Sequence, residues 1–379
     1  MDRLGTLFTA VGTLALAGLP FVVFKHNRIL PGDALSLWAA LPPRAAYACL
    51  AVLILSALTA LFVHESRVRF VVALLGIIAL AAAVAGAGNE LTPPGNRVVR
   101  VAPGAGCWLL LATLMLMATD ALTRLKPRPL VRVLLLAACA AGAGVALAHD
   151  VFDHLSVMRE YAVNSERFGR ELQRHAWLVL GSLGVAFCVA LPLGMLCHRV
   201  PRLRAGTLGV LNLVQTIPAI ALFGILMAPL AALAANVPLA ARLGIHGIGA
   251  APAVIALFLY SLLPIVANTV TGLRRVSPAA VEAARGMGMT PGQVLARIEM
   301  PLALPVVLSG VRIVLVQNIG LATIAALIGA GGLGAFVFQG IGQTAIDLVL
   351  LGAIPTVAMA FAASVLLDAL VETMDRIPQ

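Results

Sequence analysis

Long apolar stretches alternate with short polar connections along nearly the whole chain. A transmembrane helix needs about 20 consecutive apolar residues to cross the hydrocarbon core of a bilayer, and ten stretches come close to that length. They cover residues 5–24, 45–63, 70–88, 105–123, 130–148, 176–197, 206–226, 252–273, 306–327 and 346–370. The pattern therefore predicts an all-α, polytopic integral membrane bundle of about ten transmembrane helices.

Two segments interrupt this alternation. Residues 149–175 form the longest polar connection, with nearly balanced acidic and basic side chains, and we expect an external surface helix that leads into the sixth span. Residues 227–251 are apolar but contain prolines, an asparagine and an arginine, so we interpret them as an interfacial or re-entrant connection. The predicted domains are a membrane region at 1–148, the connection at 149–175 and a second membrane region at 176–379.

Composition supports a membrane protein and excludes a nucleic-acid binder. Hydrophobic residues make up 61% of the chain and charged residues 11%, whereas a soluble domain has about a quarter charged residues. The net charge of +10 comes from Lys and Arg in short clusters between apolar stretches, without the interleaved aromatics of a nucleic-acid surface. The first stretch, 5–24, exceeds the about 7–15 apolar residues of a signal peptide, so we expect it to be retained.

Basic clusters predict the orientation, because Lys and Arg in short loops are held on the cytoplasmic side. With the amino terminus inside, the connections after the second, fourth, sixth and eighth spans are cytoplasmic and carry the larger basic clusters. We therefore expect a multi-pass protein of the bacterial inner membrane, surrounded by lipid, with both termini in the cytoplasm.

The connection at residues 274–305 is predicted to hold two short helices. A Ser-Pro pair at 277–278 suits an N-cap and first helical position, and this helix should end before Gly288. Thr290 begins a second helix with a capping-box spacing, and Pro301 should end it. Both helices are shorter than the about 12–15 residues that are stable alone. They must pack on their own bundle or on a soluble partner.

The spacing of six residues in this connection identifies a family. These residues are Glu282, Ala283, Ala284, Gly288, Ile298 and Pro301. The pattern resembles the EAA loop of binding-protein-dependent ABC importer permeases, with Met300 where leucine is usual, over about residues 170–375. The resemblance implies a type I importer core and a coupling helix that docks on a cytoplasmic ABC ATPase. It also implies an external, periplasmic substrate-binding protein and a second permease, either a copy or a homologue.

Other segments of the second half resemble the osmoprotectant branch of these importers. They are residues 212–218, 260–264, 268–274 and 326–334, and the extra leading spans resemble a longer subtype. This implies a permease subunit for glycine betaine or related quaternary amines. Because methionine and phosphonate importers carry similar glycine runs, another small solute such as an amino acid remains an alternative. With three Trp and three Tyr no aromatic cage is evident, so a separate protein should recognise the substrate.

Polar residues in the spans of the second half are candidates for a translocation path. They are Asn212, Gln215, Thr216, Asn268, Gln317 and Asn318. Each is costly in lipid unless it pairs or faces water. Interhelical hydrogen bonding explains any single one better than a path does, whereas the set as a whole favours a path. Three charges near the ends of spans, Asp120, Arg312 and Asp368, are expected to reach individually toward water.

A glycine-rich segment follows the ninth span. Its glycines are Gly329, Gly331, Gly332 and Gly334. They match a dinucleotide-binding pattern, but that fingerprint needs a strand and a helix in an aqueous βαβ unit, so nucleotide binding is excluded. A gate on the translocation path and close helix packing remain equally good explanations.

No catalytic or metal-binding constellation is evident in the sequence. The cysteines lie singly in apolar stretches and the histidines singly in loops or at span ends, so we expect no enzyme, no metal and no cofactor. The chain has no Walker A lysine motif, so ATP would be hydrolysed by the partner subunit. An ion-coupled secondary transporter, which would need paired intramembrane acids or repeated halves, and a membrane scaffold are the competing classes.

Overall fold

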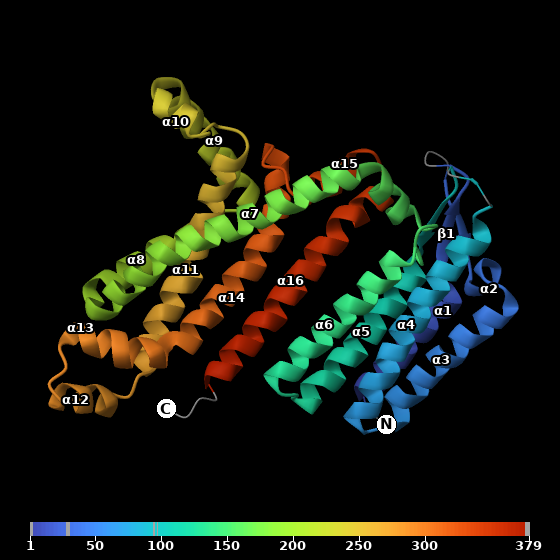
Figure 1. Cartoon of the computed structure of the whole chain (residues 1–379), viewed down its shortest axis with the longest axis horizontal. Helices are drawn as coiled ribbons and strands as arrows, with labels where there is room; N and C mark the ends of the chain where they lie inside the picture. Colours follow the sequence, from blue (N-terminus) through green and yellow to red (C-terminus); the bar gives the residue numbers. More distant parts are fainter. Residues whose placement is uncertain (1–2, 28–30, 94, 97, 376–379) are drawn as a thin grey trace. The chain divides into compact units, whose positions relative to one another are not determined.

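The computed structural model describes residues 3–27, 31–93, 95–96 and 98–375 of the 379-residue chain (Figure 1). The chain divides into two compact units. One comprises Met1–Arg128 with Ala137–Val163, and the other comprises Pro129–Leu136 with Asn164–Gln379. The boundary in the long helix α7 falls at Asn164, whose φ of −112° and ψ of 16° are non-helical.

The first unit is a helical bundle with a small sheet. Its helices are α1 (Arg3–Gly18), α2 (Leu37–Ala40), α3 (Pro43–Phe62), α4 (Ser66–Leu91), α5 (Ala105–Leu125) and most of α6 (Pro129–Ala148). Strands β1 (Val22–Lys25), β2 (Asp33–Leu35) and β3 (Arg100–Pro103) form an antiparallel sheet in the order β2-β1-β3. The sequence did not indicate this sheet, because strands of three or four residues are too short to show alternation.

The second unit contains the remaining helices. They are α7 (Ser156–Arg199, from Asn164 onward), α8 (Pro201–Thr216), α9 (Ala219–Asn236), α10 (Pro238–Arg242), α11 (Ala250–Arg275), α12 (Pro278–Gly286), α13 (Pro291–Val294), α14 (Met300–Ile324), α15 (Gly334–Gly342) and α16 (Ile346–Asp375). A π-helical turn, Leu295–Glu299, joins α13 to α14, and a 3₁₀ turn, Ala325–Ile328, follows α14. Figure 1 shows α12 and α13 at one end of α11 and α14, with α15 toward the opposite end of α14.

The predicted membrane-spanning helical architecture is confirmed. Among the described residues, nine helices are long and apolar enough to cross a bilayer, and α1, with 16 residues, is a shorter apolar helix. The segment predicted as a surface helix before the sixth span is helical from Ser156 and continues directly into that span as α7.

The predicted seventh span, 206–226, is wrong. Helix α8 ends at Thr216, and Pro218 separates it from α9. Proline lacks an N–H and disfavours helical backbone in the residue before it, and Ile217 is accordingly extended, with φ −72° and ψ 127°. Helix α9 continues to Asn236 and is itself a candidate span, so the first ten residues of 227–251 belong to that helix rather than to a separate connection.

Close packing of α7 on α11 depends on Gly194. A Cβ atom built at Gly194 would lie 2.6 Å from Cβ of Thr269, which is buried in α11. A Cβ built at Gly184, ten residues earlier on an exposed face of α7, would meet nothing within 4 Å.

These two glycines provide a matched test of the packing. We predict that Gly194→Ala destabilises the protein by about 1–3 kcal/mol, because the helices must separate. Gly184→Ala should be neutral or stabilising by up to about 1 kcal/mol, because alanine favours a helix. Thermal unfolding in detergent measures both, and equal effects would contradict the close contact.

Candidate docking segment and interior polar sites

Helix α12 begins and ends where the sequence predicts. Ser277 occupies the N-cap and Pro278 the first helical position. The backbone carbonyl of Ser277 accepts hydrogen bonds from the N–H groups of Ala280 (3.1 Å) and Val281 (3.3 Å), although its side chain makes no capping bond. The chain reverses after the helix at Gly288, where φ is +84°, a conformation that strains residues with a Cβ.

The second short helix starts as predicted but does not end at Pro301. The Thr290 hydroxyl accepts from the Gln293 N–H (3.4 Å), and the Gln293 side chain accepts from the Thr290 N–H (2.9 Å), which completes the capping box. The helix then widens into the π turn, where the Met300 N–H donates to the Leu295 carbonyl. Pro301 follows this turn within a helical run that continues without a break into α14, so the proline does not end the helix.

We call residues 277–290 the docking segment. Ala284, 1% exposed, is its buried contact and faces the region of α13, where Val294 is equally buried. Glu282, Ala283 and Gly288 are exposed, and the Met287 side chain is 70% exposed. The segment therefore rests on a narrow buried edge and presents most of its surface outward.

The other two motif residues lie beyond the docking segment. Ile298 is half-buried in the π turn, and Pro301 is exposed at the start of α14. They belong to residues 291–301, which join the docking segment to α14 and are called the stem below.

A buried ion pair, which sequence reasoning missed, anchors this stem. The Glu299 carboxylate, in a residue that is 4% exposed, accepts a hydrogen bond of 2.7 Å from Nη2 of Arg199, the last residue of α7. The sequence offered one signal for this pair, since Glu299 is an acid between two apolar residues beside the motif. Its partner lies 100 residues away in sequence, where no local pattern could identify it.

Asn318 joins three helices in the interior of the second unit. The side chain is fully buried, and its Nδ2 donates to the hydroxyl oxygens of Ser182 (3.2 Å) on α7 and Ser261 (3.0 Å) on α11. Its Oδ1 has no hydrogen-bond partner among the described residues. Interhelical hydrogen bonding therefore accounts for the amide nitrogen, while one buried acceptor remains open.

Gln215 supplies a hydrogen-bond donor in place of one that a proline removes. Pro264 within α11 has no N–H to donate to the carbonyl of Tyr260, four residues earlier. Nε2 of Gln215 donates to that carbonyl at 2.8 Å, and the Tyr260 hydroxyl donates back to the carbonyl of Ile217, beside the break between α8 and α9. Each of the two proline-containing regions thus donates a hydrogen bond to a backbone carbonyl of the other.

The remaining candidates for the translocation path do not converge on one point. Asn212 and Thr216 are exposed one helical turn apart on α8, so they share a face. Asn268 is half-buried and donates to the Pro264 carbonyl at 2.8 Å within α11. Gln317 is half-buried on α14. The six residues form separate polar positions within the second unit, and their part in a path stays a prediction.

The glycine turn, defined here as residues 329–334, is held by α7. Its residues 329, 331 and 332 have φ values of +76°, +76° and +84°. The Gly332 N–H donates to the Glu171 carboxylate at 2.6 Å, and Nε of Arg174 donates to the Ala330 carbonyl at 2.5 Å. A Cβ on Gly334 would lie 1.9 Å from the Thr323 carbonyl oxygen. The glycines thus permit close packing, and they also set a turn fixed by charged side chains.

The expectation that three charges stand alone is wrong. Arg312 on α14 forms an ion pair with Asp368 on α16. Asp120 pairs with Arg69 (3.6 Å) and Arg124 (3.0 Å), and the buried Arg69 also donates to backbone carbonyls at the end of α3. The sequence did not reveal these partners because they come from other turns or other helices.

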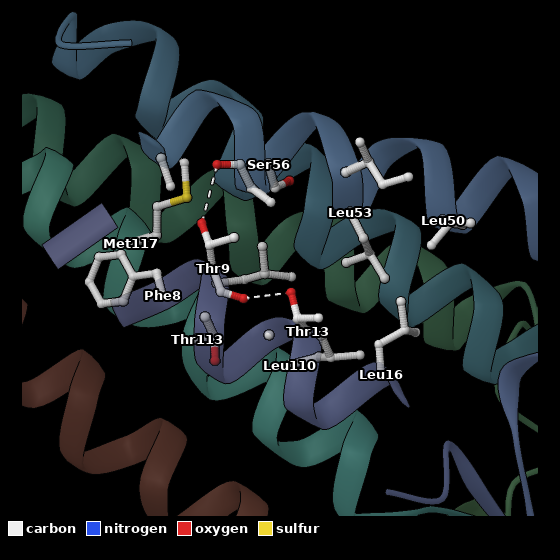
Figure 2. A pocket seen from close by; sticks show the side chains of 15 residues that line it. Phe8, Thr9, Thr13, Leu16, Leu50, Leu53, Ser56, Leu110, Thr113 and Met117 are labelled. Atoms are coloured by element: carbon white, nitrogen blue, oxygen red, sulfur yellow. Dashed lines mark hydrogen bonds between the residues drawn. The ribbon is translucent and has the colours of Figure 1, made fainter. Parts of the chain in front are cut away.

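The first unit holds an apolar cavity of about 220 Å³ between α1, α3 and α5 (Figure 2). Hydroxyl groups line part of its wall. The Thr9 hydroxyl donates to the carbonyls of Gly5 (2.9 Å) and Ala57 (3.3 Å), and the hydroxyls of Thr13 and Thr113 also donate to backbone carbonyls. The wall therefore offers mainly apolar contact.

Comparison with known proteins assigns the two parts of the chain to known families. Residues 2–158 match the family described as "ABC transporter permease YehY, N-terminal domain". Residues 190–376 match the family described as "Binding-protein-dependent transport system inner membrane component".

Individual relatives match about half of this chain. The osmoprotectant import permease protein OsmW of Salmonella typhimurium is 46% identical over 48% of this chain and 79% of its own. The carnitine transport permease protein OpuCD of Listeria monocytogenes is 41% identical over 57% and 90%. The choline transport system permease protein OpuBD of Bacillus subtilis is 39% identical over 56% and 87%.

The fold and the relatives define a class. This chain is a multi-pass membrane permease, and it belongs to the binding-protein-dependent transport system inner membrane component family of ABC transporters. The sequence-based assignment to this family is confirmed. A solved structure of the MetNI methionine ABC transporter also aligns, with 22% identity over 55% of this chain and 96% of that one and a TM-score of 0.46, which is too loose to support an inference.

The bond from Gln215 to the Tyr260 carbonyl gives a testable prediction. We predict that Gln215→Leu destabilises the protein by about 1–3 kcal/mol, because it leaves a buried carbonyl without a donor. In a Pro264→Ala background the new N–H can reach that carbonyl, so the same substitution should cost less than half as much. Thermal unfolding of the four proteins measures the cycle. An equal cost in both backgrounds would show that Gln215 does not compensate for Pro264.

Proposed function

We propose that this chain is the permease subunit of an ATP-driven importer that moves osmoprotectants, glycine betaine or related quaternary amines, across the bacterial inner membrane. The observation that carries the proposal is the set of relatives: permeases for osmoprotectants, carnitine and choline each match about half of this chain at 39–46% identity. The family match at residues 190–376 includes the whole docking segment.

The docking segment is the proposed contact for a cytoplasmic ABC ATPase. Its exposed Glu282 offers a charge, Ala283 permits close approach and Met287 supplies a flexible apolar contact. Gly288 sets the corner between α12 and α13. This arrangement favours a soluble partner over packing on the chain's own bundle, because the larger surface of α12 is open. ATP binds and is hydrolysed on that partner, and this chain is not itself an enzyme.

Basic clusters support the orientation of this segment. With both termini in the cytoplasm, the segment lies on the same side as the larger Lys and Arg clusters. The opposite side then faces a substrate-binding protein, which recognises the amine. A second permease, either a copy of this chain or a homologue, completes the membrane part.

The proposal predicts that two docking-segment variants fail to transport. Glu282→Arg reverses the exposed charge, and Gly288→Pro forbids the positive φ of the corner. Each should lower ATP-dependent uptake of radiolabelled glycine betaine at least about tenfold, since a misplaced charge or corner costs several kcal/mol at an interface. Uptake is measured in proteoliposomes that contain the complex purified from native membranes, after correction for the amount of inserted permease.

Matched variants control for the chemistry of the substitution. Glu166→Arg reverses an acid whose side chain is 92% exposed on α7. Gly292→Ala adds a methyl group where nothing lies within 4 Å. Both should transport normally. Normal uptake by Glu282→Arg and Gly288→Pro would refute the docking role, and uptake that persists without ATP would favour an ion-coupled transporter.

A further inference from the structure

Helices α7 and α14 are fastened together at three levels within the second unit. The levels are the stem of the docking segment, the contact of Asn318 on α14 with Ser182 on α7, and the glycine turn. Two apolar clusters join the helices between these levels. Leu178 and Val179 of α7 share a buried cluster with Ile319 and Ala322 of α14, and Ala186, Ala190 and Cys197 of α7 share another with Val314 of α14. The contact is thus distributed along both helices.

The first fastening is the ion pair of Arg199 and Glu299. Glu299 is the last residue of the π turn, which continues directly into α14. Because Glu299 is buried, loss of its partner would leave a buried charge uncompensated. The end of α7 must therefore follow any displacement of the stem that carries the docking segment.

The second fastening is polar and lies in the middle of the unit. Nδ2 of Asn318 donates to the Ser182 hydroxyl of α7 at 3.2 Å, and all three residues of the cluster that includes Ser261 are fully buried. A buried amide that slides past its acceptors loses both bonds without gaining water. This contact resists sliding of α7 along α14.

The third fastening joins α7 to Ile319, near the end of α14, and to the glycine turn. The fully buried His175 ring contacts the Ile319 carbonyl through Nε2 at 3.1 Å. One turn earlier, Glu171 accepts from the Gly332 N–H, and Arg174, the residue directly before His175, donates to the Ala330 carbonyl. Arg167 extends the grip to α15, donating to the Gln339 side chain at 2.7 Å and lying 4.9 Å from the centre of the Phe336 ring.

Helix α7 keeps helical backbone angles between these fastenings, although Pro192 lies within the stretch and removes one helical hydrogen bond. From Glu171 to Arg199 it spans about 42 Å at 1.5 Å per residue, and its one residue with non-helical backbone angles, Asn164, lies before this stretch. A packed helix does not stretch or compress appreciably, because interiors are close-packed and transmit strain. A helix held at both ends and in the middle moves with its partner as one body.

We propose that α7 and α14 form a single transmitting pair, in which Arg199 with Glu299 and Glu171 with Gly332 are positioning contacts. The pair carries a displacement of the docking segment to the glycine turn at its far end. This inference rests on the proposed function, because it assigns the displacement to the docked ATPase. The glycine turn then moves in response to nucleotide, because α7 prevents α14 from bending when the docking segment is displaced.

The test breaks and then rebuilds the first fastening. Arg199→Glu places two acids together, and the double variant Arg199→Glu/Glu299→Arg restores an ion pair in reversed order. Arg202→Glu is the matched control, since it reverses an exposed cation three residues beyond Arg199. A second variant, Glu171→Ala, breaks the far fastening and leaves the docking stem intact.

Two readouts separate transmission from simple stability. The first is ATP-dependent uptake of radiolabelled glycine betaine by the complete complex in proteoliposomes, with basal ATP hydrolysis measured alongside. The second is amide hydrogen exchange in residues 326–334 with and without ATP and vanadate. We expect Arg199→Glu and Glu171→Ala to keep ATP hydrolysis, lose roughly tenfold or more of uptake, and lose the nucleotide-dependent change in exchange. The double variant should recover uptake to within about twofold, and Arg202→Glu should resemble the wild type.

Each outcome has a consequence. Uptake and exchange like those of the wild type in both Arg199→Glu and Glu171→Ala would overturn the proposal, as would failure of the charge-swapped pair to restore either readout. If the wild type shows the nucleotide-dependent exchange, and Arg199→Glu loses it, while no variant takes up glycine betaine, the transmitting pair stands and the proposed substrate is refuted.

Discussion

A backbone inside a bilayer must satisfy its own hydrogen bonds, and the second unit is arranged around the places where its helices fail to do so. Pro264 deprives the Tyr260 carbonyl of its helical donor, and Gln215 supplies another from α8. The glycine turn leaves the helical conformation, and side chains of α7 bind the Gly332 N–H and the Ala330 carbonyl. Each break is thus also a point of attachment between helices, which is why the irregular segments hold the bundle together.

The two ends of α14 show opposite solutions to this constraint. At one end the π turn carries the chain past Pro301 and leads to α12, whose larger surface remains open. At the other end the glycine turn is enclosed by charged groups of α7. An open surface suits a partner that binds and leaves, and an enclosed turn suits a part that moves with its neighbours. This division of roles fits a permease that is driven by one partner and supplied with substrate by another.

Features that depend on local sequence were predictable, and those that depend on distant partners were not. Apolar length gave the spans, while the spacing around Glu282 gave the family and the start of α12. The break at Pro218 was missed because an apolar stretch on both sides of a proline has the length of one helix. The pairs of Arg199 with Glu299 and of Arg312 with Asp368 join residues far apart in sequence. The role of Pro301 was misjudged because a π turn has no sequence signature of its own.

Contact between the docking segment and an ATPase is the central claim, and site-specific cross-linking tests it most directly. A photoreactive amino acid replaces Met287, which is exposed on the docking segment, and in a second strain it replaces Ile341, which is exposed near the glycine turn. After irradiation of intact cells, mass spectrometry identifies the adducts. We predict an adduct with an ABC ATPase from position 287 and none from position 341. No ATPase adduct at position 287, or equal ATPase adducts at both positions, would contradict the account.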